Sequence, residues 1–166
     1  MIRHKAGEAV PVAFRAAGCF CLSGDEVLLI QRQQGKPFAL HWGIPTGKIE
    51  PGETAAQCMA RELAEEIGLA VQLDALMPVA DYVVDDRGTV FDYTAFALRL
   101  PNKPELTLRR EEVRRAEWVK VTRVRKRRVV PFFGNTLRDL REWIERGEVA
   151  PRPGFEPEVN AAGTKT

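Results

Sequence analysis

The segment from Thr54 to Ile67 constrains the fold of this chain most, because it has both a start signal and a stop signal for an α-helix. Thr54 is followed three residues later by Gln57, which is the pattern of a capping box at a helix N-terminus. Gly68 comes directly after the segment, where a residue in the left-handed conformation commonly ends a helix. The sequence therefore predicts one well-defined helix in the middle of the chain.

The predicted helix has an apolar face and an acidic face. At about 100° per residue, one set of apolar side chains falls within about 60° and predicts the stripe that faces the core: Ala56, Ala60, Leu63 and Ile67. A neighbouring arc holds Glu62, Glu65 and Glu66, and Glu53 adds a carboxylate just before the first turn. The acidic side chains are therefore expected at one side of the core stripe.

The acidic face contains charges that repel one another. Glu62 and Glu66 are four residues apart, a spacing at which like charges destabilise a helix by about 0.2–0.5 kcal/mol. On these residues alone, the cluster is either an ordinary solvated surface or the binding site of a cation. Mg²⁺ and Mn²⁺ select oxygen ligands of this kind, so they are the cations that fit.

The rest of the chain alternates short apolar runs with turn residues, which is typical of β-strands. Two pairs of runs predict β-hairpins, residues 10–22 with 27–30 and residues 79–84 with 89–100. A further strand is expected at residues 117–121 and a surface helix at residues 135–146. This order favours an α/β fold in which a mixed sheet lies between helices.

Length and composition fit one globular domain. The 166 residues are 45% hydrophobic, and we expect a domain at residues 1–150 with a disordered tail at residues 151–166. The three cysteines lack metal-site spacing, and neither a signal peptide nor a membrane-spanning run is evident, so we expect reduced thiols in a cytoplasmic protein. A net charge of only +2 does not favour a nucleic-acid-binding protein.

The acidic helix lies within a longer motif. Residues 47–69 read GKIEPGETAAQCMARELAEEIGL and match all nine specified positions of G-x5-E-x7-R-E-U-x-E-E-x-G-U, in which U is a bulky aliphatic residue. This pattern is the Nudix box, and the preceding residues 41–47 are similar to the W-x-x-P-G-G sequence of the same family. Thr46 is a departure, because it stands where glycine is common. The chain thus resembles a Nudix hydrolase, which implies an α/β/α sandwich with a mixed sheet.

The resemblance also implies an activity and a set of site residues. Nudix enzymes hydrolyse a diphosphate linkage in a nucleoside diphosphate joined to another moiety, with Mg²⁺ or Mn²⁺ as cofactor. By analogy, the metal would be held by Glu65, Glu66 and the carbonyl of Gly47, with Glu53 as a ligand or a water-mediated partner. Glu62 is the candidate for orienting or deprotonating the attacking water, and it also belongs to the predicted metal set. Arg61 is expected to fix the carboxylates through an ion pair.

Three further residues complete the predicted site. The family often adds a glutamate from a late loop ahead of a strand that contains Trp, and Glu112 is the candidate here, although a solvated acidic residue would look the same. Arg32 is expected to contact a phosphate and Trp42 to contact the substrate. Aromatic residues on strands are also common in cores, so packing is the alternative for Trp42.

The substrate and partners stay open at this stage. A (deoxy)nucleoside triphosphate and a nucleotide sugar such as ADP-ribose both fit the motif. Residues 120–128 contain six basic residues in nine, which makes removal of pyrophosphate from RNA 5′ ends an alternative, beside a solvated basic surface. A Nudix module that binds a nucleotide without cleaving it is another alternative. The oligomeric state is not indicated, and a homodimer is compatible with the sequence.

Overall fold

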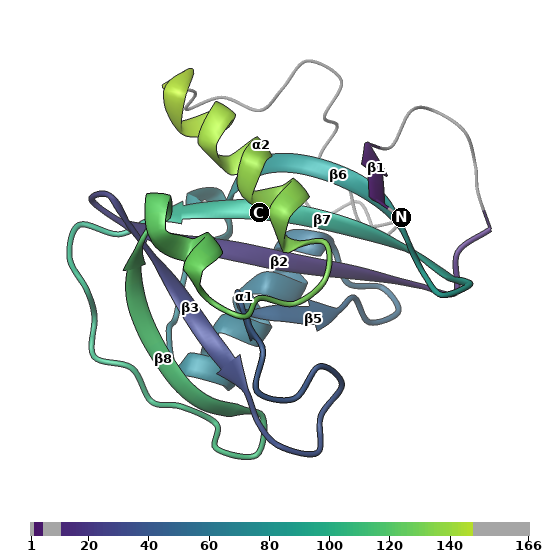
Figure 1. Ribbon diagram of the computed structural model, residues 1–166, viewed down its shortest axis with the longest axis horizontal. Coiled ribbons are helices and arrows are strands. Elements are labelled where there is room, and N and C mark those ends of the chain that lie inside the picture. The colour runs from purple at the N-terminus through teal and green to yellow at the C-terminus, as the bar shows by residue number, and fades with distance from the viewer. Residues whose placement is uncertain (1, 5–10, 148–166) are drawn as a thin grey trace.

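A mixed eight-stranded sheet forms the centre of the molecule (Figure 1). The computed structural model describes residues 2–4 and 11–147. The strands are β1 (Ile2–His4), β2 (Phe14–Ser23), β3 (Glu26–Arg32), β4 (Trp42–Gly43), β5 (Thr46–Lys48), β6 (Met77–Asp86), β7 (Thr89–Arg99) and β8 (Val113–Lys120). Their main path runs β1-β6-β7-β2-β3-β4, with β5 paired to β2 and β8 paired to β3.

Strand β2 is the element on which the site is built. One of its edges pairs in parallel with β7, from Phe14 opposite Phe91 to Leu22 opposite Arg99. Its other edge is divided, because the first half pairs with β5 and the last residues pair with β3. Both predicted hairpins, β2–β3 and β6–β7, are antiparallel pairs in the structure and are confirmed.

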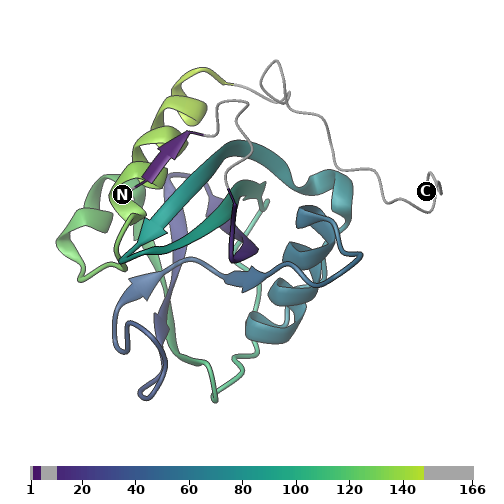
Figure 2. The same cartoon turned by 90° about the vertical axis from the view of Figure 1, so that its right-hand side faces the viewer.

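Two helices of 13 residues, α1 (Ala55–Ile67) and α2 (Phe133–Glu145), cover opposite faces of the sheet (Figure 2). Side chains alternate between the faces of a strand, so β2 contributes to two cores. Cys19 and Cys21 pack with α1, whereas Phe20 and Leu22 pack with α2. The predicted α/β/α sandwich with a mixed sheet is therefore confirmed.

The ends of α1 are confirmed, but its buried face differs from the prediction. Thr54 forms the capping box with Gln57, and Gly68 ends the helix in the left-handed conformation. Ala56 and Ala60 are only half-buried, and the buried residues are Ala55, Cys58, Met59, Leu63, Glu66 and Ile67. The helix is rotated toward Glu66 because Met59 offers more apolar surface to bury than either alanine does.

Other boundaries differ by a few residues. Strand β8 begins four residues before the predicted strand, because pairing with β3 extends it to Val113. The basic run becomes the short 3-10 helix η2 (Val121–Lys126), and a second one, η1 (Leu73–Ala75), precedes β6. The three cysteines are free thiols, and all three are buried. Within the described residues no helix is long and apolar enough to cross a membrane, and the predicted tail lies outside them.

Candidate active site

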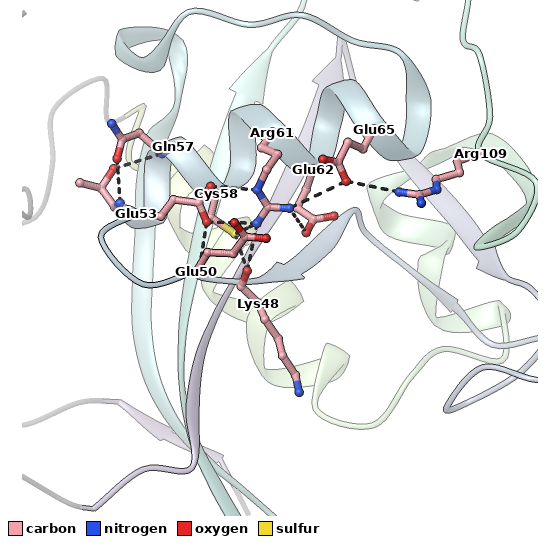
Figure 3. Close-up of polar contacts among 10 residues, drawn as sticks. Lys48, Glu50, Glu53, Gln57, Cys58, Arg61, Glu62, Glu65 and Arg109 are labelled. Carbon is pink, nitrogen blue, oxygen red and sulfur yellow. Dashed lines mark hydrogen bonds and ion pairs between the residues drawn. The ribbon is translucent and has the colours of Figure 1, made fainter.

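Arg61 is the centre of the polar network on α1 (Figure 3). Its Nε and Nη2 donate to the two carboxylate oxygens of Glu53 at 2.9 and 3.0 Å. Its Nη1 donates to Glu62 Oε1 at 2.8 Å, and Nη2 also donates to the carbonyl of Lys48 at 3.1 Å. One guanidinium thus joins the helix, the loop before it and strand β5, as expected for the predicted ion pair.

Glu53 is fully engaged by protein donors. Besides the two bonds from Arg61, its Oε2 accepts a hydrogen bond from the backbone N–H of Glu50 at 3.0 Å. Hydrogen bonding from Arg61 lowers the pKa of the Glu53 carboxyl, so this group is ionised. Both oxygens already have donors, which favours the water-mediated role over direct ligation.

Gly47 lies directly against Glu62. A Cβ built at Gly47 would collide with the Glu62 carboxylate, so only glycine allows strand β5 to approach α1 this closely. Burial raises the pKa of Glu62, while Arg61 acts in the opposite direction. The predicted carbonyl ligand and the predicted base are therefore neighbours in the structure.

Glu66 is a buried carboxylate with little compensation from the protein. Its residue is 5% exposed, and its Oε2 accepts a hydrogen bond from the backbone N–H of Thr46 at 3.3 Å. Burial, followed by repulsion from Glu62 and Glu112, raises the pKa of Glu66 to about 8. A group that is costly to ionise in the free protein is suited to a site where a cation will later lie beside it.

Glu65 points away from the core toward a second arginine (Figure 3). Its Oε2 lies 3.3 Å from Arg109 Nη1 and 3.9 Å from Arg61 Nη1. Arg109 also lies 3.6 Å from Glu112, and Glu112 is close enough to raise the pKa of both Glu62 and Glu66. The structure thus brings the predicted late-loop glutamate to the acidic helix.

The sequence analysis assigned no role to Arg109. The segment before β8 docks on the end of α1, where Thr107 N donates to Ile67 O and Arg109 N donates to Glu66 O. These bonds join residues about 40 positions apart in the sequence, so no local pattern signals them. Glycine at position 68 is also required here, because a Cβ would touch Thr107.

The donor set fits a hard divalent cation, although it is not yet arranged around one. Among the residues that the structure describes, no group of three acidic, His or Cys side chains is placed to hold a metal ion as it stands. Arg61 and Arg109 instead bridge the carboxylates. Binding would have to displace the ion pairs of Glu65 with Arg61 and Arg109, whereas the buried Glu66 already lacks a strong partner.

A cavity of about 340 Å³ is lined by β5 and lies apart from the carboxylates of α1. All three β5 residues line it, together with Arg32, the residue that the sequence analysis predicted to contact a phosphate. Its aromatic lining includes Phe38 and the stacked pair Phe14 and Phe91, whose ring centroids are 4.7 Å apart. Arg32 Nε donates to Pro37 O at 2.7 Å, which holds its guanidinium at the cavity wall.

Trp42, the other predicted substrate contact, lies in the hydrophobic core. Its residue is 6% exposed and packs in the cluster that includes α2. The guanidinium of Arg127 covers the indole, 5.2 Å from the ring centroid. This burial favours a packing role, so a substrate contact by Trp42 stays a prediction that the geometry does not support.

Comparison with known sequences identifies the family. The NUDIX domain family matches residues 13–140, a span that contains α1, the cavity-lining strand β5 and Glu112. The chain belongs to the Nudix family. Nudix proteins are typically dependent on divalent metals, in agreement with the oxygen-rich donor set on α1.

Curated relatives match over part of their length. A putative 8-oxo-dGTP diphosphatase 2 of Mycobacterium tuberculosis is 46% identical over 63 residues, which are 38% of this chain and 43% of the relative. The 8-oxo-dGTP diphosphatase of Proteus vulgaris is 36% identical over 72 residues, 43% of this chain and 64% of the relative. The chain thus matches less than two-thirds of either relative, and the similarity shows the family rather than the substrate.

Solved structures confirm the Nudix fold. The Nudix domain of Shewanella oneidensis NrtR, complexed with ADP ribose, is 17% identical with a TM-score of 0.70, covering 84% of this chain and 94% of that one. A Nudix hydrolase from Nitrosomonas europaea is 19% identical with a TM-score of 0.69, covering 89% and 98%. At these identities, the similarity is one of fold alone.

Proposed function

We propose that this chain hydrolyses a phosphoanhydride bond of a nucleoside triphosphate, or of another nucleoside diphosphate derivative, with Mg²⁺ or Mn²⁺. The observation that carries the proposal is the position of β5 between two features. On one side, Gly47 lies against the carboxylate of Glu62, beside the buried Glu66. On the other side, the same strand lines a cavity of about 340 Å³, large enough for a small ligand.

The proposed roles follow from burial and partners. Glu66, Glu65 and the carbonyl of Gly47 hold the cation, which when bound neutralises phosphate charge and lowers the pKa of water. Glu62, whose own pKa is raised by burial, accepts the proton from the attacking water. Arg61 is the positioning residue, since it holds Glu62 in place.

Two outer carboxylates have supporting roles in this proposal. Both oxygens of Glu53 accept hydrogen bonds from the protein, and Glu53 fixes the guanidinium of Arg61. Glu112 lies within 3.6 Å of Arg109, which also contacts Glu65. We assign Glu112 to the late-loop position, from which it adds negative charge beside the cation.

The cavity supports a nucleotide as the substrate. Arg32 and Lys48 are the basic side chains of its lining and are suited to phosphates. The ring pair of Phe14 and Phe91 offers an aromatic wall for a base. Asp86 also lines the cavity and can accept hydrogen bonds from a guanine-type base. Oxidised guanine nucleotides are therefore the first substrates to test, in line with the names of the curated relatives.

The alternative of RNA as a substrate rests on residues 120–128. Part of this charge is already neutralised, because Lys120 pairs with Asp25 at 3.3 Å and Arg127 pairs with Glu117 at 2.7 Å. Arg123, Arg125 and Lys126 are exposed, and no acidic partner is recorded for them within the described part of the chain. We keep RNA as the second candidate because these three cations are available to a polyanion.

The test is a substrate panel with identification of the products. The panel contains 8-oxo-dGTP, dGTP, dATP, ADP-ribose and a 5′-triphosphorylated RNA, each with Mg²⁺, with Mn²⁺ and with excess EDTA. We expect turnover that requires the metal, with a nucleoside monophosphate among the products. Turnover of RNA alone would favour the second candidate. Absence of turnover on every member, with nucleotide still bound, would support a non-catalytic binding module and overturn the proposal.

A further inference from the structure

We propose that Thr46 and Tyr93 form a positioning pair that holds the Thr46 N–H against Glu66 and thereby strengthens cation binding. Position 46 is where this chain departs from the glycine that is common in its family. The inference rests on the proposed function in one respect, since it takes Glu66 to be a ligand of the cation. Neither residue would touch the cation, so both act through Glu66.

The hydrogen bonds of Thr46 restrain it on both sides. Its Oγ1 donates to the carbonyl of Ile44 at 3.0 Å, and this bond fixes the turn that leads into β5. The Tyr93 hydroxyl lies 3.5 Å from the same Oγ1. Because the Thr46 hydroxyl proton is used toward Ile44, the tyrosine is the donor in this second contact. The side chain of Thr46 therefore links the turn to strand β7.

The backbone of Thr46 has a different partner, which is the reason for its proposed effect. Its N–H donates to Glu66 Oε2 at 3.3 Å, the one hydrogen bond recorded for this carboxylate among the described residues. Small movements of the turn would change this contact, since hydrogen bonds weaken steeply with distance and angle. A side chain that fixes the turn thus fixes the orientation of the Glu66 carboxylate.

Gly18 provides the room in which the pair meets. It lies opposite Thr46 in the β2–β5 register, and its partner across the parallel β2–β7 pair is Ala95, two residues after Tyr93. A Cβ built at Gly18 would collide with the Tyr93 hydroxyl and lie 2.9 Å from Thr46 Oγ1. The absence of a side chain at this position, buried between two strands, is what allows the two hydroxyls to approach one another.

The test measures Mn²⁺ binding by the full chain without nucleotide, so that its outcome does not depend on turnover. Thr46→Val keeps the shape of the side chain and removes the hydroxyl, whereas Thr46→Ser keeps the hydroxyl. We expect the Kd for Mn²⁺ to rise about tenfold in Thr46→Val, in the range typical of partners that orient a metal ligand, and to stay within about twofold in Thr46→Ser. Tyr93→Phe should weaken binding in the same direction as Thr46→Val.

A matched control is available on β7, the strand of Tyr93. Thr94 points to the opposite face of β7, where its Oγ1 donates to Asp81 Oδ1 at 2.6 Å. Thr94→Val therefore removes a hydroxyl at the neighbouring position without touching the turn, and its Kd for Mn²⁺ should equal that of the unaltered chain. Thermal unfolding of each variant verifies that the measurement is made on folded protein.

The steady-state kinetics of the same variants give a second measurement. Thr46→Val should require more Mg²⁺ for half-maximal activity than the unaltered chain, whereas Thr46→Ser should require about the same concentration. A purely structural role would instead lower stability without moving the metal dependence. Equal Mn²⁺ affinity in Thr46→Val and the unaltered chain would overturn the inference alone. Absence of Mn²⁺ binding by the unaltered chain would overturn the proposed function with it.

Discussion

The two helices that enclose the sheet each bury one carboxylate, and the two carboxylates are treated differently by the rest of the protein. Asp139 on α2 is 2% exposed and Glu66 on α1 is 5% exposed. Asp139 Oδ2 accepts a hydrogen bond from the Tyr82 hydroxyl at 2.6 Å. Glu66 has a backbone N–H at 3.3 Å and lies near two other carboxylates that repel it.

We interpret this difference as one between a structural carboxylate, Asp139, and a carboxylate that we propose as a ligand of the cation, Glu66. A buried acid with a short hydrogen bond contributes to the folded state, because the group is satisfied by the chain itself. A buried acid with a long bond and like-charged neighbours destabilises the folded state until a cation arrives. We therefore expect that replacing the buried carboxylate of α1 weakens metal binding and stabilises the metal-free protein. Changes around the buried carboxylate of α2 should alter stability without altering metal binding.

The largest predicted effect is that of Glu66→Gln. We expect its metal-dependent activity to fall at least about 100-fold, because one proposed ligand of the cation is lost. The same change should raise the Tm of the metal-free protein at pH 8, where the unaltered residue is costly to ionise. The control is Glu145→Gln, an exposed glutamate at the end of α2, which should change neither quantity. A Glu66→Gln protein with full activity would contradict the proposal that Glu66, unlike Asp139, is a ligand of the cation.

The second prediction concerns Arg61→Lys. An ammonium group cannot reproduce the four hydrogen bonds that reach Glu53, Glu62 and the Lys48 carbonyl. We expect kcat to fall about 10–100-fold, an effect comparable to the loss of a partner that orients a metal ligand. Measurement of kcat across Mg²⁺ concentrations tests this. If saturating Mg²⁺ with the lysine variant gave the unaltered kcat, Arg61 would have no positioning role.

The third prediction is the pH dependence of stability in the metal-free protein. The pKa of Glu66 is about 8 in the folded chain, above its ordinary value of 4.5, so the folded state keeps this proton after the unfolded chain has lost it. The contribution of Glu66 to stability is present below pH 4.5 and is lost as pH rises toward 8, by at most about 1.4 kcal/mol per pH unit. Chemical denaturation at several pH values measures it.

Two comparisons isolate the contribution of Glu66 to that pH profile. Glu66→Gln should flatten the decline, and Mg²⁺ should reduce it in the unaltered chain by stabilising the ionised form. Glu53 affects stability in a different pH range. Because Arg61 lowers the pKa of Glu53, the stabilising effect of this carboxylate is lost only in acid. An identical decline in the Gln variant would assign the effect to other groups.

The smallest predicted effect is on the α2 side. Tyr82→Phe removes the hydroxyl that donates to Asp139, and we expect a loss of about 1–3 kcal/mol in the free energy of unfolding. Activity per folded molecule should stay unchanged at a temperature well below the Tm. Denaturant unfolding and an activity assay on the same preparation compare the two. A loss of activity in the folded variant would show that the two faces are coupled.

The sequence predicted those parts of the molecule that depend on neighbouring residues. The ends of α1 followed from Thr54, Gln57 and Gly68, which act within one helical turn. The acidic residues of the site followed from the motif at residues 47–69. The burial of Glu66 did not, because the larger side chain of Met59 turned the helix away from the alanine stripe.

Features that depend on distant segments could not be predicted in this way. The contact of Arg109 with Glu65 requires the loop before β8 to dock on α1 through backbone hydrogen bonds. The cavity collects residues from β2, β5, β7 and the start of α2. Trp42 illustrates the converse, since a plausible substrate contact in the sequence packs beneath Arg127 in the core.

The central claim is that the carboxylates of α1 bind a divalent cation around Glu66. The most direct measurement is a calorimetric titration of Mn²⁺ into the metal-free chain at pH 7, in two buffers of different ionisation enthalpy. Because the pKa of Glu66 is about 8, binding should release close to one proton per ion, and Glu66→Gln should abolish that release. Binding without proton release, or binding that survives unchanged in the Gln variant, would contradict the claim.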